Sequence, residues 1–373
     1  MIFDRIGIFT SLLISLTTPF ILSQDAQIQV HSSCLQLDQV IEHQSNFPIV
    51  KEVKTLQIPG LKFGYNPSIV RVGGKTLVFF RYDVENILVD TGHKKQKSFV
   101  ACCEFSEDLD SVVQVTEIAL NSYFAEDPRA IVYKDEIYLF YNCPVSNPLF
   151  AKIRPGRRMC VAKIDPWSLR VNEQKMIQYY EFSTEKNWIP FIVPPSTKEE
   201  GIYLIHTLQN FKVLKLDLEN LSNVNLVYEK ADKVKEIGKW DKKWGTARGG
   251  SPAILVDDEY WMFFHSFYRP DTGGIDVHNY ICGAMVFDSK PPFLPKRMLN
   301  DPIVFNGMYT SHYRRANTYT TYPAGLVYDP KEDLFLVSIG ENDRVMKVLT
   351  IPRKSLEQHM QPVDQDQTPL DTY

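Results

Sequence analysis

The chain has 373 residues, of which 44% are hydrophobic and 12% aromatic, so it can bury one large core or two ordinary ones. Its formal charge of −4 and pI near 6.1 give it no overall basic field. The one dense basic cluster, between residues 152 and 163, is short enough to be a loop surface or an anion contact. Composition therefore predicts an ordinary globular protein and argues against a nucleic-acid partner.

The N-terminus carries an uncharged, largely apolar run from Ile6 to Leu22, which follows Arg5 and precedes a polar stretch. This layout is typical of a secretory signal with cleavage near Ser23, and the length of the run also suits a short signal-anchor in a membrane. Both alternatives direct the rest of the chain into the secretory pathway, to the extracellular space or to the lumen of the endoplasmic reticulum or Golgi. The predicted division is a signal or anchor (1–23), a polar leader (24–53), one domain (54–353) and a polar tail (354–373).

Six cysteines lie beyond the predicted signal: Cys34, Cys102, Cys103, Cys143, Cys160 and Cys282. An oxidising lumen would allow one to three disulfides, whose pairing is not readable from the sequence. Buried free thiols on strands are an equal alternative for Cys102, Cys103 and Cys282. No Cys/His spacing typical of a metal site appears. The sequon Asn220-Leu221-Ser222 would accept a glycan if its loop is exposed.

A unit of two strands recurs along the chain, and its clearest copy begins at Glu126-Asp127-Pro128-Arg129. Two carboxylates, a proline and an arginine stand directly before the apolar run Ala130 to Tyr133, so this charged cluster should occupy the mouth of a strand. A polar turn and a second apolar run, Ile137 to Tyr141, complete the unit.

Five copies of this unit are marked by prolines spaced about 61, 62, 62 and 71 residues apart, a period typical of arrays and propellers. The prolines are Pro67, Pro128, Pro190, Pro252 and Pro323. Further strands are expected between the copies, at 98–105, 159–164, 211–216, 280–287 and 345–351, and helical periodicity is almost absent. The pattern favours an all-β fold, a five-bladed β-propeller, over a sandwich or an irregular all-β fold with coincidental spacing.

In a propeller the first strand of each blade lines the central channel, and its entry faces the mouth where ligands bind. Polar residues at those entries are therefore expected to converge on one pocket: Asn66, Glu126, Asp127, Arg129, Lys186, Asn187, Arg248 and Tyr322. Each alone is more simply a solvated turn residue, but their shared register in several copies favours a site. The aromatic excess suits stacking on sugar rings, although most of it is expected in the core.

Several of these motifs, taken in order, resemble those of the β-mannoside phosphorylases and hydrolases of glycoside hydrolase family 130 and of related mannosyltransferase/phosphorylases, which are five-bladed propellers. They are Glu126-Asp127-Pro128-Arg129, Glu185-Lys186-Asn187-Trp188, Gly249-Gly250-Ser251-Pro252, Phe263-Phe264-His265, Tyr280-Ile281-Cys282-Gly283-Ala284 and Tyr322-Pro323-Ala324-Gly325. The resemblance spans roughly residues 63–352, and the first two motifs are its most specific parts.

The resemblance implies roles for the matching residues. Asp127 would be the single general acid, acting through a hydroxyl of the bound mannose, and Lys186 and His265 would hold inorganic phosphate. The pocket around the mannose would include Asn66, Arg81, Glu126, Arg129 and Asp343. It leaves the second-blade phosphate arginine open among Arg154, Arg157 and Arg158, with Arg248 as a further candidate. The fourth-blade motif reads Phe-Phe-His-Ser where Tyr-His-Gly is common in the family.

An acid on one face of the sugar and an anion held on the other suit an inverting displacement. The expected function is phosphorolysis of β-mannosides or the reverse mannosyl transfer, with inorganic phosphate or mannose 1-phosphate as co-substrate and no other cofactor. A secretory address favours transfer, because a lumenal enzyme meets acceptor glycans. An inverting β-mannosidase is less expected, because the family's hydrolases replace the phosphate-binding cations with carboxylates. A non-catalytic glycan-binding propeller is a further alternative. The sequence does not define the oligomeric state.

Overall fold

The computed structural model describes residues 35–61, 63–84, 97–122, 124–144, 156–182, 184–230, 234–270, 277–309, 311 and 318–364. The predicted signal or anchor, Cys34 and the end of the predicted tail lie outside these residues. Within them the chain is mostly β-sheet with three short helices, which confirms the all-β prediction. No helix in this part of the chain is long and apolar enough to cross a membrane.

Three of the sheets contain four strands each, which follow one another along the chain and pair antiparallel. The first group is β2 (Gly64–Val72), β3 (Lys75–Val84), β4 (Lys97–Phe105) and β5 (Val112–Glu117). The second is β6 (Glu126–Tyr133), β7 (Glu136–Pro144), β8 (Arg157–Ile164) and β9 (Val171–Met176). The third is β10 (Ile189–Val193), β11 (Gly201–Thr207), β12 (Lys212–Leu216) and β13 (Val224–Tyr228).

A ten-stranded sheet holds two more groups, joined where three residues of β17 run parallel to three of β19. The fourth group is β14 (Ala247–Gly249), β15 (Ile254–Val256), β16 (Glu259–Tyr268), β17 (His278–Asp288) and β18 (Pro295–Leu299). The fifth is β19 (Thr318–Asp329), β20 (Leu334–Glu341) and β21 (Val345–Pro352).

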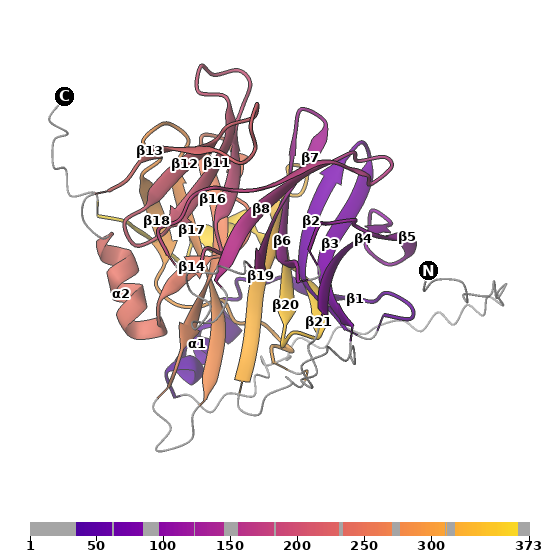
Figure 1. The fold of residues 1–373 in the computed structure, drawn as a ribbon. Coiled ribbons are helices and arrows are strands. Elements are labelled where there is room, and N and C mark those ends of the chain that lie inside the picture. Colours follow the sequence, from indigo (N-terminus) through magenta and orange to yellow (C-terminus); the bar gives the residue numbers. More distant parts are fainter. Residues whose placement is uncertain are drawn as a thin grey trace, which may run out of the picture.

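Both ends of the described chain complete these last two groups. Strand β1 (Glu52–Leu56) pairs antiparallel with β21, beside which it lies in Figure 1, and β22 (Met360–Pro362) pairs with β18. Helix α3 (Arg353–Glu357) leads into β22. The predicted boundaries at 53/54 and 353/354 therefore fall inside β1 and at the start of α3, and the predicted leader and tail both contribute to the sheets.

With β14 and β15, which both pair antiparallel with β16, taken together as the first strand of the fourth group, the first strands of the five groups contact one another in a closed order. Strand β2 packs against β6, β6 against β10, β10 against β15, β15 against β19, and β19 against β2. Strands near this ring, such as β3 and β7, are mostly buried, whereas the last strands β5, β9 and β13 are exposed or partly exposed along their whole length. The core thus consists of strands buried on both faces, and the entries of the first strands are brought together.

Two helices occupy segments where the sequence analysis expected none. Helix α1 (Leu35–Asn46) lies in the predicted polar leader, and its Leu37 and Val40 are buried in the largest hydrophobic cluster. Helix α2 (Lys235–Trp244), at the periphery of the strands in Figure 1, buries Ile237, Trp240 and Trp244. These apolar residues are three and four positions apart, which is the spacing of one helical face.

The five described cysteines are buried free thiols, as the alternative without disulfides expects for Cys102, Cys103 and Cys282. Cys143 and Cys160 lie on the adjacent strands β7 and β8 with their sulfur atoms 2.9 Å apart. Asn220 of the sequon is exposed in the turn between β12 and β13.

Candidate active site

A cavity of about 350 Å³ opens where the first strands of the groups begin. Ten of the eleven predicted site residues line it: Asn66, Arg81, Glu126, Asp127, Lys186, Asn187, Arg248, His265, Tyr322 and Asp343. They come from all five strand groups or the loops that enter them. The structure therefore brings together residues that are up to 277 positions apart in the sequence, as the repeat pattern predicts.

The backbone presents the key side chains in an uncommon conformation. Asn66, Asp127 and Asn187 have φ angles of 51°, 55° and 65°, in the left-handed region that Asn and Asp tolerate better than most residues. The pairing register of β2 shifts between Tyr65 and Ser68, and that of β6 shifts between Glu126 and Arg129. Such bulges re-aim a side chain and occur frequently beside active sites. The repeated motif thus encodes a bulge at the strand entry, which turns its amide or carboxylate toward the cavity.

Asp127 is 8% exposed and held by three side chains. Its Oδ1 accepts a hydrogen bond from Asn66 Nδ2 at 2.8 Å and lies 3.7 Å from Arg81 Nη1, while its Oδ2 accepts from Asn142 Nδ2 at 3.4 Å. Burial disfavours the ionised form, but Arg81, Lys186 and Arg129 outweigh it and hold the pKa of this carboxyl below its ordinary value. In the unliganded protein Asp127 is therefore an ionised, oriented carboxylate.

Glu126 bridges two arginines. Its Oε1 lies 3.1 Å from Arg81 Nη2 and its Oε2 lies 3.1 Å from Arg157 Nη2. Burial raises the pKa of Glu126, Arg81 opposes this shift, and the charge of Asp127 adds to it. The two adjacent carboxyls therefore have pKa values shifted in opposite directions, as happens in acid/base sites where neighbouring carboxyl groups take different roles.

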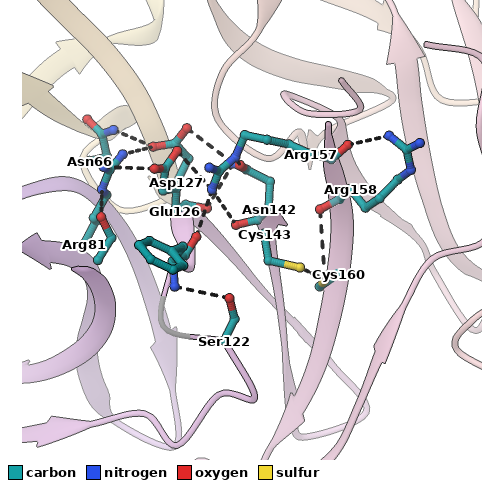
Figure 2. A network of polar contacts seen from close by, with 12 residues as sticks. Asn66, Arg81, Ser122, Glu126, Asp127, Asn142, Cys143, Arg157, Arg158 and Cys160 are labelled. Atoms are coloured by element: carbon teal, nitrogen blue, oxygen red, sulfur yellow. Dashed lines mark hydrogen bonds and ion pairs between the residues drawn. The ribbon is translucent and has the colours of Figure 1, made fainter. Parts of the chain in front are cut away.

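Figure 2 shows how these carboxylates connect to strands β7 and β8. Arg157 donates to the side chain and backbone oxygens of Asn142, and Asn142 donates in turn to the Glu126 carbonyl and to Asp127. Neither Asn142 nor its place in the network was predicted from the sequence. The Asn142 amide lies on the second strand of its unit, β7, and not at the first-strand entry that carries the motif.

Arg81 is fixed from its other side by Ser98 and Asp83, which the sequence analysis missed, and by Tyr65. Its Nε donates to Ser98 Oγ at 3.1 Å and lies 3.4 Å from Asp83 Oδ1, and its guanidinium lies 4.9 Å from the ring centroid of Tyr65. Asp83 also accepts a hydrogen bond from the Tyr65 hydroxyl. The sequence does hold one indication of this contact: Arg81 and Asp83 are two residues apart on β3, so their side chains lie on the same face of the strand.

Arg129 does not line the cavity, which corrects the prediction that it contacts the sugar. It is fully buried beneath the cavity, at 0% exposure. Its guanidinium donates to the carbonyls of Gly249 and Gly250, to Asn187 Oδ1 and to the hydroxyl of Tyr322. Arg129 points away from the cavity because it follows the bulge in β6. The bulge changes the side to which the next side chain turns, so that of Arg129 enters the space between strand groups. It thus contacts Asn187 and Tyr322, which themselves line the cavity.

The same cavity also carries the predicted anion-binding residues. Lys186 and Arg248 are exposed, and within the described residues neither side chain has a hydrogen bond or ion pair. His265 faces Arg248 directly across the β14–β16 pair and is 2% exposed. Burial, together with Arg129, Arg248 and Lys186, holds the pKa of His265 well below its ordinary value. Two cations without a hydrogen bond or ion pair in the described part of the chain, and a neutral imidazole, thus line this cavity.

Of the arginines left open between residues 154 and 158, the two that the structure describes, Arg157 and Arg158, do not line the cavity. Arg154 lies outside the described residues, and Arg157 is engaged by Glu126. Arg158 donates to the carbonyl of Arg157 and stacks its guanidinium 4.8 Å from the ring centroid of Tyr180. Among the described candidates for the phosphate arginine, Arg157, Arg158 and Arg248, it is Arg248 that lines the cavity together with Lys186 and His265.

The remaining wall of the cavity was not predicted. It consists of Phe267, His278, Tyr280, Thr318 and Thr320, which come from β16, β17 and β19. Their signal was weak, because aromatic residues alternating along strands are equally expected in a core. Groups of three or more His, Cys, Asp or Glu that could hold a metal ion do not occur in the part of the chain that the structure describes.

Comparison with known proteins gives one sequence relative and several structural ones. No family model matches the chain. Beta-mannosyltransferase 6 of Candida albicans is 30% identical over 103 residues, which cover 26% of this chain and 16% of that protein. The chain thus matches a small part of that relative's length.

Solved structures share the fold. A member of the GH130 family of mannoside phosphorylases and hydrolases has a TM-score of 0.54 at 15% identity, covering 79% of this chain and 85% of that one. The β-1,2-mannobiose phosphorylase of Listeria innocua has a TM-score of 0.56 at 13% identity, covering 84% of this chain and 94% of that one. A GDP-Man-dependent mannosyltransferase of Leishmania mexicana has a TM-score of 0.57 at 13% identity, covering 89% of this chain and 98% of that one. The chain therefore resembles the GH130 mannoside phosphorylases and hydrolases and mannosyltransferase-like proteins in fold.

Proposed function

We propose that the chain is an inverting mannoside-active enzyme on a five-bladed β-propeller, and that it transfers mannose between an anion and an acceptor hydroxyl. The five strand groups, with their first strands in a closed ring of contacts, support the propeller, in which each group is one blade. The shared fold with mannoside phosphorylases and mannosyltransferases supports the sugar. The single observation that carries the chemistry is one cavity with a held carboxylate, Asp127, and free cations, Lys186 and Arg248.

The step requires groups on opposite faces of the anomeric carbon. In the transfer direction, ionised Asp127 accepts the proton of the acceptor hydroxyl while the acceptor oxygen forms a bond to C1 of the mannose. At the same time the C1–O bond to the phosphate breaks, and its electron pair leaves with the phosphate. Lys186, Arg248 and neutral His265 stabilise that departing anion. In the reverse direction inorganic phosphate attacks, and Asp127 must first be protonated. Because Lys186 contributes to the low pKa of Asp127, an anion bound at Lys186 favours that protonation.

Asn66, Arg81, Glu126, Asn187, Tyr322 and Asp343 surround the place left for the mannose, and we propose them as its binding residues. We propose inorganic phosphate or a mannosyl phosphate as co-substrate and a lumenal or extracellular location for the enzyme, in keeping with the apolar N-terminal run. Transfer is favoured over hydrolysis, because a hydrolytic site needs a base for water where this cavity has cations.

The test is an assay of the purified protein with mannose 1-phosphate, nucleotide-linked mannose and β-mannosides, with and without inorganic phosphate. We expect a mannoside to be formed from a phosphate-linked donor, or cleaved in a phosphate-dependent way. Cleavage that is independent of phosphate would show a hydrolase. Binding of β-mannosides without turnover of any donor would show a glycan-binding propeller and overturn the proposal.

A further inference from the structure

Two cysteines lie in contact beside the network that holds the carboxylates. Cys143 on β7 and Cys160 on β8 have their sulfur atoms 2.9 Å apart, and Figure 2 shows the two side chains turned toward each other. Cys160 pairs with Tyr141, which lies two residues before Cys143, so both cysteines lie on one face of this antiparallel pair of strands. The fold therefore places two thiols where one covalent bond would join β7 to β8.

The other described cysteines are placed differently from this pair. Cys282 donates to the carbonyl and hydroxyl of a threonine. Cys102 and Cys103 are neighbours on β4, so their side chains leave opposite faces of the strand. Cys143 and Cys160 are buried together, at 6% and 3% exposure, in one hydrophobic cluster. A zinc ion at this pair would need further ligands, and no group of three or more His, Cys, Asp or Glu that could hold a metal occurs among the residues that the structure describes.

The surroundings of the pair favour thiol–disulfide exchange. The hydrogen bond from Cys160 holds the pKa of the Cys143 thiol below its ordinary value, while burial opposes this shift and Arg157 adds to it. The same hydrogen bond raises the pKa of Cys160, and burial raises it further. Cys143 is therefore the sulfur that reacts first as a thiolate, and Cys160 keeps its proton until that first step is complete.

We propose that Cys143 and Cys160 form a disulfide when the chain folds in an oxidising compartment. Asn142 directly precedes one of them on β7, and Arg157 lies three residues before the other on β8. Since these two residues hold the carboxylates of the candidate active site, the disulfide joins the strands beside that network. The inference is independent of the proposed sugar chemistry, but it uses the proposed lumenal location as the source of an oxidant.

The oxidant is an exchanging disulfide, either glutathione disulfide or that of an oxidoreductase. The Cys143 thiolate attacks one of its sulfurs, and the other half leaves as a thiolate. The Cys160 sulfur then attacks Cys143 in the mixed disulfide, gives up its proton and displaces the second half. Two S–H bonds are replaced by one S–S bond, and the exchanging disulfide takes up two electrons and two protons as it becomes two thiols. Because both cysteines are buried in the folded protein, this exchange takes place before folding is complete.

Peptide mapping of the unreduced protein tests the bond directly. The full chain is secreted from a eukaryotic host, unfolded in iodoacetamide without reductant and cut with trypsin, which cleaves after Arg157 and Arg158 and so separates the two cysteines. We expect their peptides to remain joined, with a mass two hydrogens below the sum of the reduced peptides. Cys102 and Cys103 are the control and should be alkylated in the same digest. Protein from a reducing cytosol should have both cysteines of the pair alkylated, and it should gain the link when it is refolded in a glutathione redox buffer.

Thermal unfolding gives a second measurement. A disulfide between residues 17 positions apart stabilises the protein by restricting its unfolded chain, so a reductant should lower the Tm of the secreted protein by about 5 °C. The double variant Cys143→Ser/Cys160→Ser should have the same Tm with and without reductant. Cys103→Ser is the matched control, a buried cysteine outside the pair, and should keep the response to reductant.

Alkylation of both Cys143 and Cys160 in the secreted protein, and again after refolding in the redox buffer, would overturn the inference. An equal response of the double variant and the unsubstituted protein to reductant would overturn it as well. A link that forms only in the redox buffer would support the disulfide and contradict the proposed lumenal location. Because the mapping needs no turnover, a linked protein without activity on any mannosyl donor or mannoside would contradict the proposed function and leave this inference in place.

Discussion

The two halves of the candidate active site are built in opposite ways. On the side of Asp127, every charged group is matched: Arg81 and Arg157 pair with Glu126, and Asn66 and Arg81 hold Asp127. On the other side, Lys186 and Arg248 lack any such partner among the described residues. A fully paired network is rigid before a ligand arrives, whereas unpaired cations retain a full electrostatic interaction for an incoming anion. The carboxylate group of residues is thus held in place by its own contacts, whereas Lys186 and Arg248 keep hydrogen-bond donors free for an anion.

The largest effect should come from removing the titrating group of the matched half. Asp127→Asn keeps the size and most hydrogen bonds but cannot exchange the proton, so kcat should fall by about 10²–10⁴-fold with little change in glycan affinity. Steady-state kinetics and glycan titration on one preparation measure both. The control is Asp135→Asn, an exposed turn aspartate that also has positive φ and lies outside the cavity. Unchanged turnover of Asp127→Asn, with a shifted melting temperature, would make Asp127 a structural turn residue.

Substitution of Arg129 tests whether this buried arginine stabilises the fold. Arg129→Met should lower the free energy of unfolding by at least about 3 kcal/mol, because several buried acceptors lose their donor at about 1–3 kcal/mol each. Urea unfolding followed by tryptophan fluorescence measures the loss. In Arg71→Met, a half-exposed arginine paired with Asp329 at 3.6 Å, the loss should stay within about 1 kcal/mol. Equal stability of the two variants would contradict the buried role of Arg129.

The sequence predicted the location of the site better than the contacts within it. The repeated proline and polar entry defined five strand units, and ten of the eleven predicted residues line one cavity. Arg129 was misassigned because its direction depends on a bulge, and periodicity alone does not reveal which side a residue after a bulge faces. Asn142 and Ser98 were missed for a different reason. They lie on second and third strands of their units, where a polar residue gains a partner only through sheet pairing.

The third test couples the two halves through Lys186. Lys186→Met should weaken inorganic phosphate binding by about 10-fold, the loss of one charged donor at about 1.5 kcal/mol. Because Lys186 helps to lower the pKa of Asp127, its removal should raise that pKa. The acid limb of the transfer reaction, which needs ionised Asp127, should then move to higher pH. Lys175→Met, on the exposed edge strand β9, is the control and should leave the limb in place. An unmoved limb in Lys186→Met would show that the halves act independently.

The smallest expected effect concerns His265, the neutral member of the anion-binding half. Its pKa is depressed in the folded protein by burial and by Arg129, Arg248 and Lys186, while the unfolded chain titrates near the ordinary value of about 6.5. Below that pH the unfolded state binds a proton that the folded state does not, so stability should fall as pH decreases, by up to about 1.4 kcal/mol per pH unit. Denaturant unfolding from pH 7 to 5 measures the slope, and His265→Gln should reduce it. Added inorganic phosphate should also reduce this dependence of stability on pH, because an anion beside His265 offsets the cations that keep the ring neutral. An identical pH dependence with and without phosphate would place the anion elsewhere.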